Sequence, residues 1–208
     1  VLNEYIIGEK SMKQIILATK NKNKLVEVKA VLGNDYEVLS MEDIGIDVDV
    51  EENGTTFEEN ATIKAEAICK ICGKPVMADD SGLEIDYLDK KPGVLSARFL
   101  GHDTSYDIKN AKILEMLEDV PEEKRTARFV CSIAVAFPDR DTVVVRDTIE
   151  GIIGYESAGE NGFGYDPIFY VPELKKTTAQ LSMEEKNKIS HRGKALVKMA
   201  NRLKDMNL

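Results

Sequence analysis

The fold is decided by the stretch Ala127-Arg128-Phe129-Val130-Cys131-Ser132-Ile133-Ala134-Val135-Ala136-Phe137. This stretch is rich in Val, Ile and Phe, and so is the segment 142–153 that follows it. Between them lies Pro138-Asp139-Arg140-Asp141, whose composition is typical of a turn. The sequence therefore predicts a long antiparallel hairpin, which could supply much of a β-sheet.

Strands and helices alternate in the part of the chain that precedes this hairpin. The predicted elements are a strand over 13–18, a helix over 25–32, a strand over 36–39, a loop with a strand end over 42–52, a helix over 56–73, a strand over 75–78 and a helix over 106–117. The last of these helices would turn Ile108, Ala111, Leu114 and Leu117 inward. After the hairpin, a short strand over 168–171 and a helix from about His191 complete the chain. This order predicts an α/β fold with a mixed sheet flanked by helices.

The composition is that of an ordinary globular protein and excludes several classes. The 208 residues include 28 Lys plus Arg and 37 Asp plus Glu, giving a net charge of −9. This sign opposes general attachment to nucleic acid or to an anionic membrane. No apolar run approaches the roughly 18 residues of a membrane span, and charges interrupt the first eleven residues where a signal peptide would be apolar. We expect a soluble, cytoplasmic protein with no nucleic-acid or membrane partner, and reduced thiols at Cys69, Cys72 and Cys131.

A lysine-rich loop follows the first predicted strand. It reads Thr19-Lys20-Asn21-Lys22-Asn23-Lys24 and stands where a strand ends and a helix begins. Free backbone N–H groups and the positive end of the helix dipole favour phosphate at such a place. The loop contains no glycine, so it is neither a Walker A loop nor a dinucleotide fingerprint. The alternative is a solvated, lysine-rich start of a helix.

Two acidic groups suggest a magnesium site. Glu51 and Glu52 precede an Asn-Gly turn, and Asp79 and Asp80 stand at the predicted end of an apolar strand. Adjacent carboxylates repel each other unless a cation compensates them, and hard oxygen ligands suit Mg²⁺. The alternative is that all four are surface turn residues.

Three further groups could contact a ligand. Asn60 and Lys64 share one helix face, the loop Gly162-Phe163-Gly164-Tyr165-Asp166-Pro167 offers aromatic rings to a base, and Ser190-His191-Arg192 offers hydrogen-bond donors to a keto oxygen. The alternatives are an exposed lysine, a turn with core aromatics and an ordinary helix start. A Ser-His-Asp hydrolase using Ser81 and His191 is disfavoured because no nucleophile elbow is present.

Taken together, these segments resemble the HAM1 family of inosine/xanthosine triphosphate pyrophosphatases. The resemblance runs from Met12 to about Leu203. Its blocks are 18–24 with Glu27, Thr56-Phe57-Glu58-Glu59-Asn60-Ala61 with Lys64-Ala65, Asp79-Asp80-Ser81-Gly82-Leu83, Ser96-Ala97-Arg98, 162–169 and Ser190-His191-Arg192. Asn53 and Leu95 depart from common family residues without touching a proposed catalytic role. Residues 1–11 precede the matching part and are expected to be an extension or an expression remnant, whereas 12–208 are expected to form one domain.

The resemblance implies an elongated α/β fold with a mixed twisted sheet, two lobes with a central substrate cleft, and a homodimer. It implies magnesium-dependent hydrolysis of a purine nucleoside triphosphate (ITP, dITP or XTP) to the monophosphate and pyrophosphate. An enzyme acting mainly on the standard nucleotides and a catalytically silent nucleotide-binding module are the alternatives.

The resemblance also implies a role for each matching residue. In the family pattern the phosphates are held by the loop 19–24, above all by Thr19, Asn21 and Lys24, with support from Lys64, and Asn60 is a further substrate-binding residue. Magnesium is bound by Glu52 and Asp80, and Asp80 is the general base, with Ser81 beside it contacting substrate. The base stacks on Phe163 in a loop completed by Gly164, Tyr165 and Asp166, while Lys186, His191 and Arg192 address the base and its 6-keto group. Donors in these positions would reject the 6-amino group of adenine, because its hydrogens would face donors.

Overall fold

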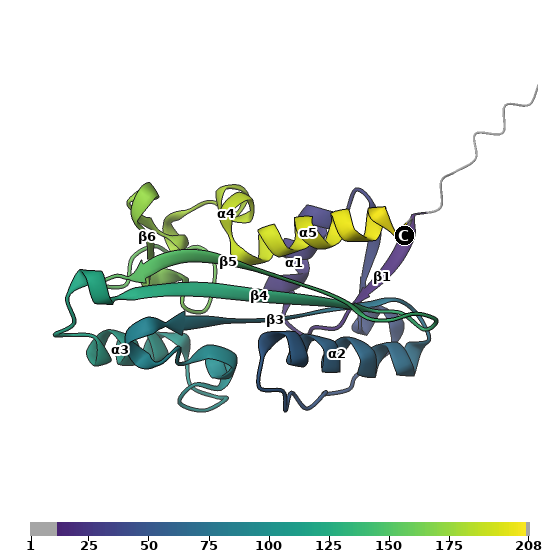
Figure 1. Cartoon of the computed structure of the whole chain (residues 1–208), viewed down its shortest axis with the longest axis horizontal. Coiled ribbons are helices and arrows are strands. Elements are labelled where there is room, and N and C mark those ends of the chain that lie inside the picture. Colours follow the sequence, from purple (N-terminus) through teal and green to yellow (C-terminus); the bar gives the residue numbers. More distant parts are fainter. Residues whose placement is uncertain (1–11, 207–208) are drawn as a thin grey trace, which may run out of the picture.

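The structure is a computed structural model, which describes residues 12–206. The expectation for residues 1–11 lies outside the described residues. In Figure 1 the molecule is elongated, with strands running along its long axis. Among the described residues, no helix is both long and apolar enough to cross a membrane.

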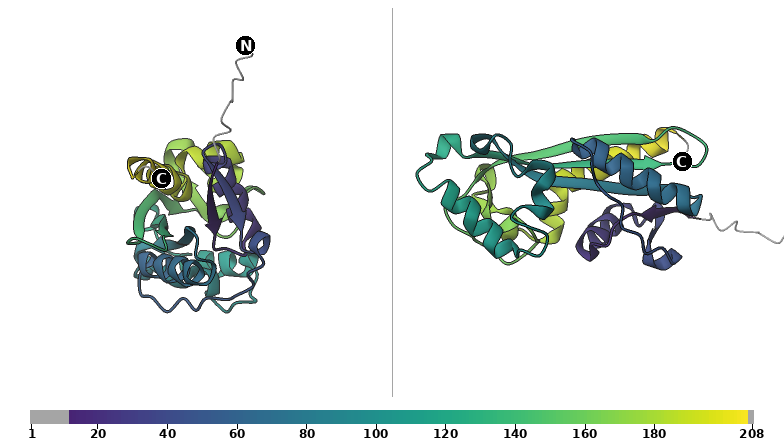
Figure 2. Two further views of the ribbon diagram at one scale, coloured as in Figure 1. Left: turned by 90° about the vertical axis from the view of Figure 1, so that its right-hand side faces the viewer. Right: turned by 90° about the horizontal axis from the view of Figure 1, so that it is seen from below.

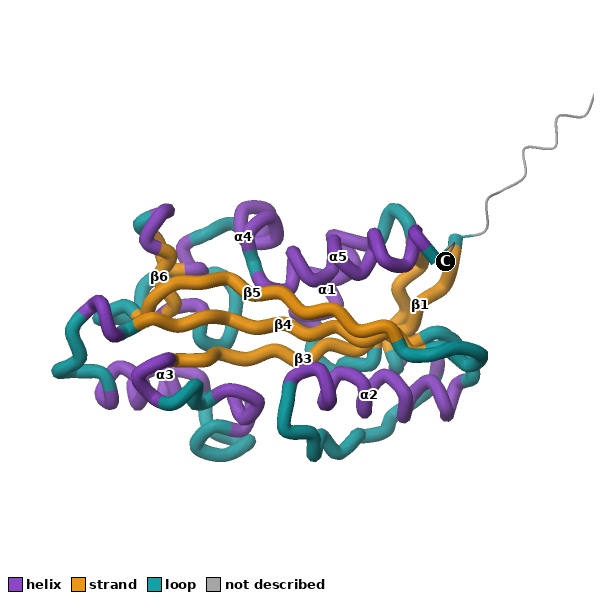
Figure 3. The backbone as a smooth tube through the Cα atoms, in the orientation of Figure 1, coloured by secondary structure: helices purple, strands orange, loops and turns teal. Residues whose placement is uncertain are grey.

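A single seven-stranded sheet forms the centre of the molecule, and its strand order is β2-β1-β3-β4-β5-β6-β7. β1 pairs in parallel with β2 and β3, and every later pair is antiparallel, so the predicted mixed sheet is confirmed. The strands are β1 (Lys13–Leu17), β2 (Tyr36–Ser40), β3 (Val76–Ile85), β4 (Thr126–Ala136), β5 (Val143–Ile153), β6 (Phe169–Val171) and β7 (Lys176–Thr177). β4 and β5 are the predicted hairpin, and with β3 they form the long axis of the sheet in Figure 3.

Helices cover both faces of the sheet. The end-on view in Figure 2 places α5 (His191–Asp205) and α2 (Phe57–Cys72) on opposite sides. α1 (Lys22–Leu32) and α4 (Met183–Ile189) accompany α5, while α3 (Tyr106–Met116) lies on the side of α2 (Figure 1). The predicted capping box of α2 is present, because Thr56 accepts a hydrogen bond from the Glu59 N–H and the Glu59 side chain accepts one from the Thr56 N–H.

The sheet separates the apolar core into layers because successive side chains of a strand point to opposite faces. In β3, Met77 packs in the core beneath α1 and α5, whereas Val76 and Ala78 pack in the core beneath α2. A third core, which includes Leu83 and Ile113, fills the other end of the molecule. The long strands therefore connect two ends of the molecule that have separate cores.

Two predictions about these elements are wrong, and one helix was not predicted. The inward face of α3 consists of Lys109, Asn110, Ile113 and the following Leu117, whereas the predicted Ile108 is 58% exposed. The buried Lys109 Nζ donates to the Ala97 main-chain oxygen at 2.6 Å, so this face pairs polar groups as well as apolar ones. The segment 42–52 contains a 3₁₀ turn, Glu42–Ile44, and no strand end. α4 was not predicted because its seven residues carry no apolar repeat, although they follow a capping box at Ser182.

The expectations about the last helix and the thiols are confirmed. α5 turns Ala195, Leu196, Met199 and Leu203 into the core. Cys69, Cys72 and Cys131 are free thiols, and burial raises the pKa of Cys131 to about 12. Free thiols, one of them with a raised pKa, give no support to a redox role for these cysteines.

Candidate active site

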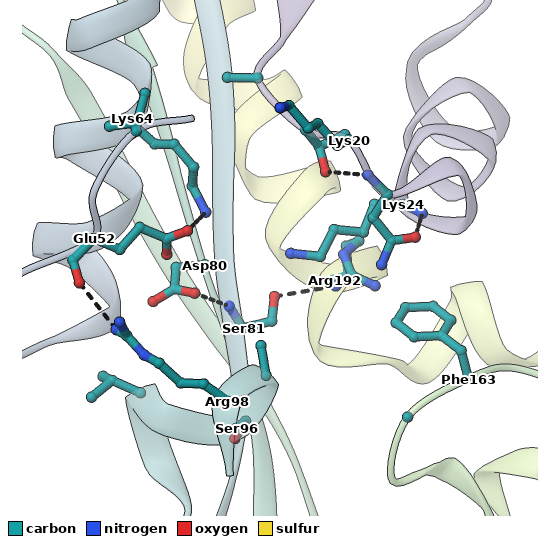
Figure 4. Close-up of a pocket in the computed structure, with 18 of the residues that line it drawn as sticks. Lys20, Lys24, Glu52, Lys64, Asp80, Ser81, Ser96, Arg98, Phe163 and Arg192 are labelled. Atoms are coloured by element: carbon teal, nitrogen blue, oxygen red, sulfur yellow. Dashed lines mark hydrogen bonds and ion pairs between the residues drawn. The ribbon is translucent and has the colours of Figure 1, made fainter. Parts of the chain in front are cut away.

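A cavity of about 710 Å³ opens between the two ends of the molecule, beside the middle of β3. It is lined by almost all of the predicted site residues, several of which are drawn in Figure 4. The predicted residues that line it are Thr19, Lys20, Asn21, Lys24, Glu52, Lys64, Asp80, Ser81, Phe163, Gly164, Tyr165, Asp166, Lys186, His191 and Arg192. Lys22, Asn23 and Asn60 are not among the lining residues.

The adjacent carboxylates Asp79 and Asp80 lie within β3, and the prediction that they end a strand is wrong. β3 continues to Ile85, paired with β4 throughout. Its other neighbour, β1, ends at Leu17, which pairs with Met77. β3 therefore loses one partner just before Asp79, and this opens the edge of the sheet at the cavity.

Because they are neighbours in a strand, the two carboxylates face different layers. Asp80 lies on the side of α2, where Asn60 Nδ2 donates to its Oδ2 at 3.1 Å. Asp79 lies on the side of α1 and α5, where it contacts Lys24 and Arg192. One strand thus supplies a carboxylate to each half of the site.

Asp80 has an unusual environment for a carboxylate. Its Oδ1 accepts a hydrogen bond from the Ser81 N–H at 3.0 Å, and the residue is only 8% exposed. Burial raises the pKa of Asp80 to about 6; nearby Glu52 adds to the rise, and Lys64 opposes it. Lys64 also pairs with Glu52, its Nζ lying 3.1 Å from Oε1 (Figure 4). At neutral pH, Asp80 is thus a carboxylate that accepts a proton readily.

Asn60 shapes this half of the site instead of lining the cavity. It is fully buried, and its Oδ1 accepts from the Gly54 N–H at 2.8 Å while its Nδ2 donates to Asp80. It therefore ties the segment that carries Glu52 to Asp80. Both polar atoms of its side chain are thus bound within the protein, and Asn60 does not reach the cavity.

Asp79 belongs to a buried network of charges. Its Oδ2 lies 2.9 Å from Lys24 Nζ and 3.2 Å from Arg192 Nε. Burial would raise the pKa of Asp79, but Lys24, Arg192 and Lys64 outweigh it and hold the pKa far below its ordinary range. Arg192 also donates to Glu27 and, at 3.2 Å, to Ser81 Oγ. These contacts occupy Arg192 with carboxylates and fix it against β3.

The loop 19–24 presents side chains more than free backbone groups. Asn21 is the N-cap of α1, and its Oδ1 already accepts from the N–H groups of Asn23 and Lys24. The expectation of free N–H groups is therefore wrong for these two residues. Lys20 and Lys24 line the cavity, whereas Lys22 and Asn23 are exposed in the first turn of α1, outside it.

The glycine-rich loop holds Phe163 opposite the carboxylates (Figure 4). Asp166 fixes the loop, since its Oδ2 accepts from the Phe163 N–H at 2.8 Å and from Lys186 Nζ at 2.7 Å. Tyr165 is buried and donates through its hydroxyl to the Ser96 carbonyl at 2.8 Å. The Phe163 ring is left half-buried, with Lys186 Nζ 4.9 Å from its centroid. Ring and cation therefore lie together at this end of the cavity.

His191 is a buried, uncharged group of the same wall. Its ring stacks on Phe129, with the centroids 4.9 Å apart. Burial, with the charges of Arg192 and Lys186, holds the pKa of His191 well below its ordinary value. Its Nδ1 has no hydrogen-bond partner among the described residues. A neutral imidazole can donate through one nitrogen and accept through the other.

Gly82 lets two segments approach β3 beside Asp80. A Cβ there would lie 2.4 Å from the Gly93 carbonyl oxygen and 2.5 Å from Ser96 Oγ. We expect Gly82→Ala to lower the free energy of unfolding by roughly 1–3 kcal/mol, because the 3₁₀ turn Gly93–Arg98 must move. Urea denaturation measures the change. Gly154→Ala is the matched control, since its Cβ would meet no atom closer than 3.6 Å, and an equal loss in both variants would contradict the prediction.

The residues at Asp80 fit a magnesium ion. Glu52 and Asp80 are close enough for the charge of one to raise the pKa of the other, and both supply oxygen ligands. Within 12–206, no group of three or more His, Cys, Asp or Glu side chains is placed to hold a metal. Mg²⁺ is often bound by one or two carboxylates together with substrate phosphates, so a pair is sufficient.

Glu27 and Arg98 had no role assigned from the sequence, and Asp79, which was grouped with the carboxylates of the expected magnesium site, has a different role. Glu27, on α1, pairs with Lys186 and Arg192, whereas Asp79 does not line the cavity and anchors Lys24 and Arg192. Arg98 lines the cavity and donates to the Glu52 carbonyl at 3.0 Å. Glu27 lies between Val26 and Val28, five residues before the predicted end of the helix at Leu32. Glu27 and Arg98 both stood in blocks that carry the family resemblance, and this was the signal that the sequence offered for them.

The fold and this cavity define an α/β protein with a cation-lined cleft that can accept a polyanion. The chain belongs to the Ham1 family, whose sequence model matches residues 15–202. The resemblance found in the sequence is thereby confirmed.

Individual relatives are similar to this chain over nearly its whole length. A dITP/XTP pyrophosphatase of Halalkalibacterium halodurans is 53% identical over 89% of this chain and 96% of its own length. One of Exiguobacterium sibiricum is 50% identical over 89% of this chain and 94% of its own. The solved structure of the Staphylococcus aureus Ham1 protein is 44% identical and covers 93% of this chain and all of its own, with a TM-score of 0.85.

Proposed function

We propose that this protein hydrolyses the non-canonical purine nucleoside triphosphates ITP, dITP and XTP to the monophosphate and pyrophosphate. One observation carries the proposal: a single cavity joins a cationic wall, the buried carboxylate Asp80 and the half-buried ring of Phe163. The relatives named dITP/XTP pyrophosphatase support it. The physiological role would be removal of deaminated purines from the nucleotide pool, in the cytoplasm.

The triphosphate would lie along the wall that carries Lys20, Lys24 and Lys64. These cations offset the charge of a polyanion inside a protein whose net charge is −9. Glu52 and Asp80 would hold Mg²⁺. When bound, this ion would neutralise phosphate charge and polarise the reacting phosphoryl group.

Asp80 would act as the general base of the reaction. A water oxygen bonds to the α-phosphorus, and its proton passes to a carboxylate oxygen of Asp80. The bond from the α-phosphorus to the bridging oxygen breaks, and pyrophosphate leaves with the electron pair. A pKa of about 6 suits this role, since the group is mostly ionised at pH 7 and still accepts a proton readily.

The base would stack on Phe163 and meet donors at its edge. Lys186 Nζ lies within 5 Å of the ring centroid, so a stacked purine would bring its 6-position to this cation and to His191. An ammonium group can only donate hydrogen bonds, so it pairs with a 6-keto oxygen and not with the 6-amino group of adenine. Arg192, which is held by Glu27, Asp79 and Ser81, would fix this wall.

Pyrophosphate release from ITP, dITP, XTP, GTP and ATP tests the proposal, with Mg²⁺ and with chelator. We expect kcat/KM for the deaminated purines to exceed that for ATP by roughly 100-fold or more, because adenine leaves donors unpaired. Chelator should abolish turnover. Equal rates on ATP would contradict the base recognition and favour an enzyme of the standard nucleotides, while no pyrophosphate from any substrate would favour a binding module.

The expected assembly belongs to the same proposal. We propose a homodimer of chains in which 12–208 act as one domain. Sedimentation equilibrium of the purified protein measures its mass in solution, and a monomer mass at micromolar concentration would contradict it.

A further inference from the structure

Arg98 differs from every other cation of the cavity. Six Lys and Arg side chains line it, and five of them pair with carboxylates within 4 Å. These five are Lys20, Lys24, Lys64, Lys186 and Arg192. Arg98 has no carboxylate partner among the described residues, so its charge is not compensated inside the protein.

Most of the donors of Arg98 are also unused. Its Nη2 donates to the main-chain oxygen of Glu52 at 3.0 Å, and its other guanidinium N–H groups make no hydrogen bond to any residue in 12–206. A guanidinium carries five N–H donors in a planar fork that matches phosphate oxygens. An uncompensated charge with free donors, facing a cavity, indicates an anionic ligand.

The position of Arg98 indicates which part of an anionic ligand it would contact. It ends the 3₁₀ turn Gly93–Arg98, which lies against β3 at Gly82, and it reaches toward Glu52 and Asp80 (Figure 4). It therefore approaches the carboxylates from the side opposite Lys64. Its contact with Glu52 also joins segments 46 residues apart in the chain.

We propose that Arg98 is a phosphate ligand that contacts the pyrophosphate group as it leaves. This inference rests on the proposed hydrolysis. Negative charge grows on the leaving pyrophosphate when its bond to the α-phosphorus breaks, and a fixed guanidinium beside it stabilises that charge. Lys64 and Arg98 then hold opposite sides of the phosphate chain.

The test compares the parent with Arg98→Ala and Arg98→Lys. We expect kcat/KM for ITP at saturating Mg²⁺ to fall by roughly 10²–10³-fold in Arg98→Ala, as on loss of one charged donor at a reacting centre. Calorimetric titration with magnesium pyrophosphate should show at least about tenfold weaker binding, whereas inosine, which has no phosphate, should bind as it does to the parent. Arg98→Lys keeps the charge, so its kcat/KM and its pyrophosphate affinity should lie between those of the parent and those of Arg98→Ala. Arg140→Ala, at the hairpin tip, is the control and should match the parent.

Two results would overturn the role of Arg98. Equal pyrophosphate affinity in parent and Arg98→Ala is the first. The second is full recovery of kcat/KM at high Mg²⁺, which would mean that Arg98 only holds Glu52 in place. If Arg98→Ala does not fold, Arg98→Lys is compared with the parent instead, provided that the two proteins have the same melting temperature. Absence of turnover in the parent would instead contradict the proposed function, because that result does not depend on Arg98.

Discussion

Asp80→Asn is expected to abolish turnover and to make the metal-free protein more stable. Loss of the proposed general base should lower kcat by about 10²–10⁴-fold, and loss of a carboxylate proposed to bind magnesium should lower it further. The gain in stability has a separate cause. Burial of Asp80 makes its ionised form costly, and asparagine removes that charge.

The size of the gain follows from the pKa. A rise from about 3.8 to about 6 costs the ionised parent about 3 kcal/mol well above pH 6. Asparagine loses one acceptor for Asn60 Nδ2, which offsets about 1 kcal/mol of this. The net gain of about 2 kcal/mol should raise the melting temperature by about 4–8 °C at pH 8.

The gain should depend on pH in one direction. Between pH 4 and 6 the folded parent binds more protons at position 80 than the unfolded chain does, so its stability falls as the pH rises through this interval. The advantage of Asp80→Asn should therefore shrink toward pH 4. Thermal melts with chelator at several pH values measure it. Asp139→Asn, at an exposed carboxylate, should change nothing. A variant no more stable than the parent at pH 8 would contradict the proposed cost.

Arg192→Met is expected to cause the largest loss of stability. Arg192 is 2% exposed and pairs with Asp79 and Glu27, so its removal leaves two buried carboxylates short of a cation. Breaking a buried ion pair on one side costs roughly 3–5 kcal/mol. Because Lys24 and Lys186 still contact these carboxylates, we expect the loss of stability to lie toward the lower end of this range.

Urea denaturation at two pH values measures this loss. In the parent, the lowered pKa of Asp79 contributes stability that is present above pH 4 and is lost only as the pH falls through its depressed value. Without Arg192 this pKa should rise, so the gap between the two proteins should narrow below about pH 5. Arg140→Met, at an exposed pair, should cost less than about 0.5 kcal/mol. An equally small cost in Arg192→Met would show that the network does not stabilise the fold.

Local patterns predicted the elements whose own residues determine them. The hairpin of β4 and β5, the capping box at Thr56 and the apolar stripe of α5 follow from alternation, caps and helical spacing. α3 was different, because Lys109 and Asn110 are buried by hydrogen bonds to distant main-chain oxygens. The spacing of apolar residues along a helix gives no information about such distant partners.

In the candidate site, too, some features follow from local sequence and others depend on distant partners. Its loops were found because their residue types are rare in combination. The strand through Asp79 and Asp80 was cut short because carboxylates have low strand propensity, and only pairing with β4 keeps them extended. Arg98 and Glu27 are single residues whose meaning lies in partners 46 and 165 positions away. Such pairings become visible only in three dimensions.

The placement of Asp79 and Asp80 on opposite faces of β3 limits how this family can evolve. Removing one residue from the strand before them would exchange their surroundings, so that Asp80 would lie beneath Arg192 and Asp79, the anchor of Arg192, would lie beneath α2. Exchange of one apolar residue for another at 76–78 keeps each carboxylate on its own face of the sheet. We therefore expect insertions and deletions to be harmful at 76–78 and tolerated at the turn over 138–142, where no side chain has to keep its face.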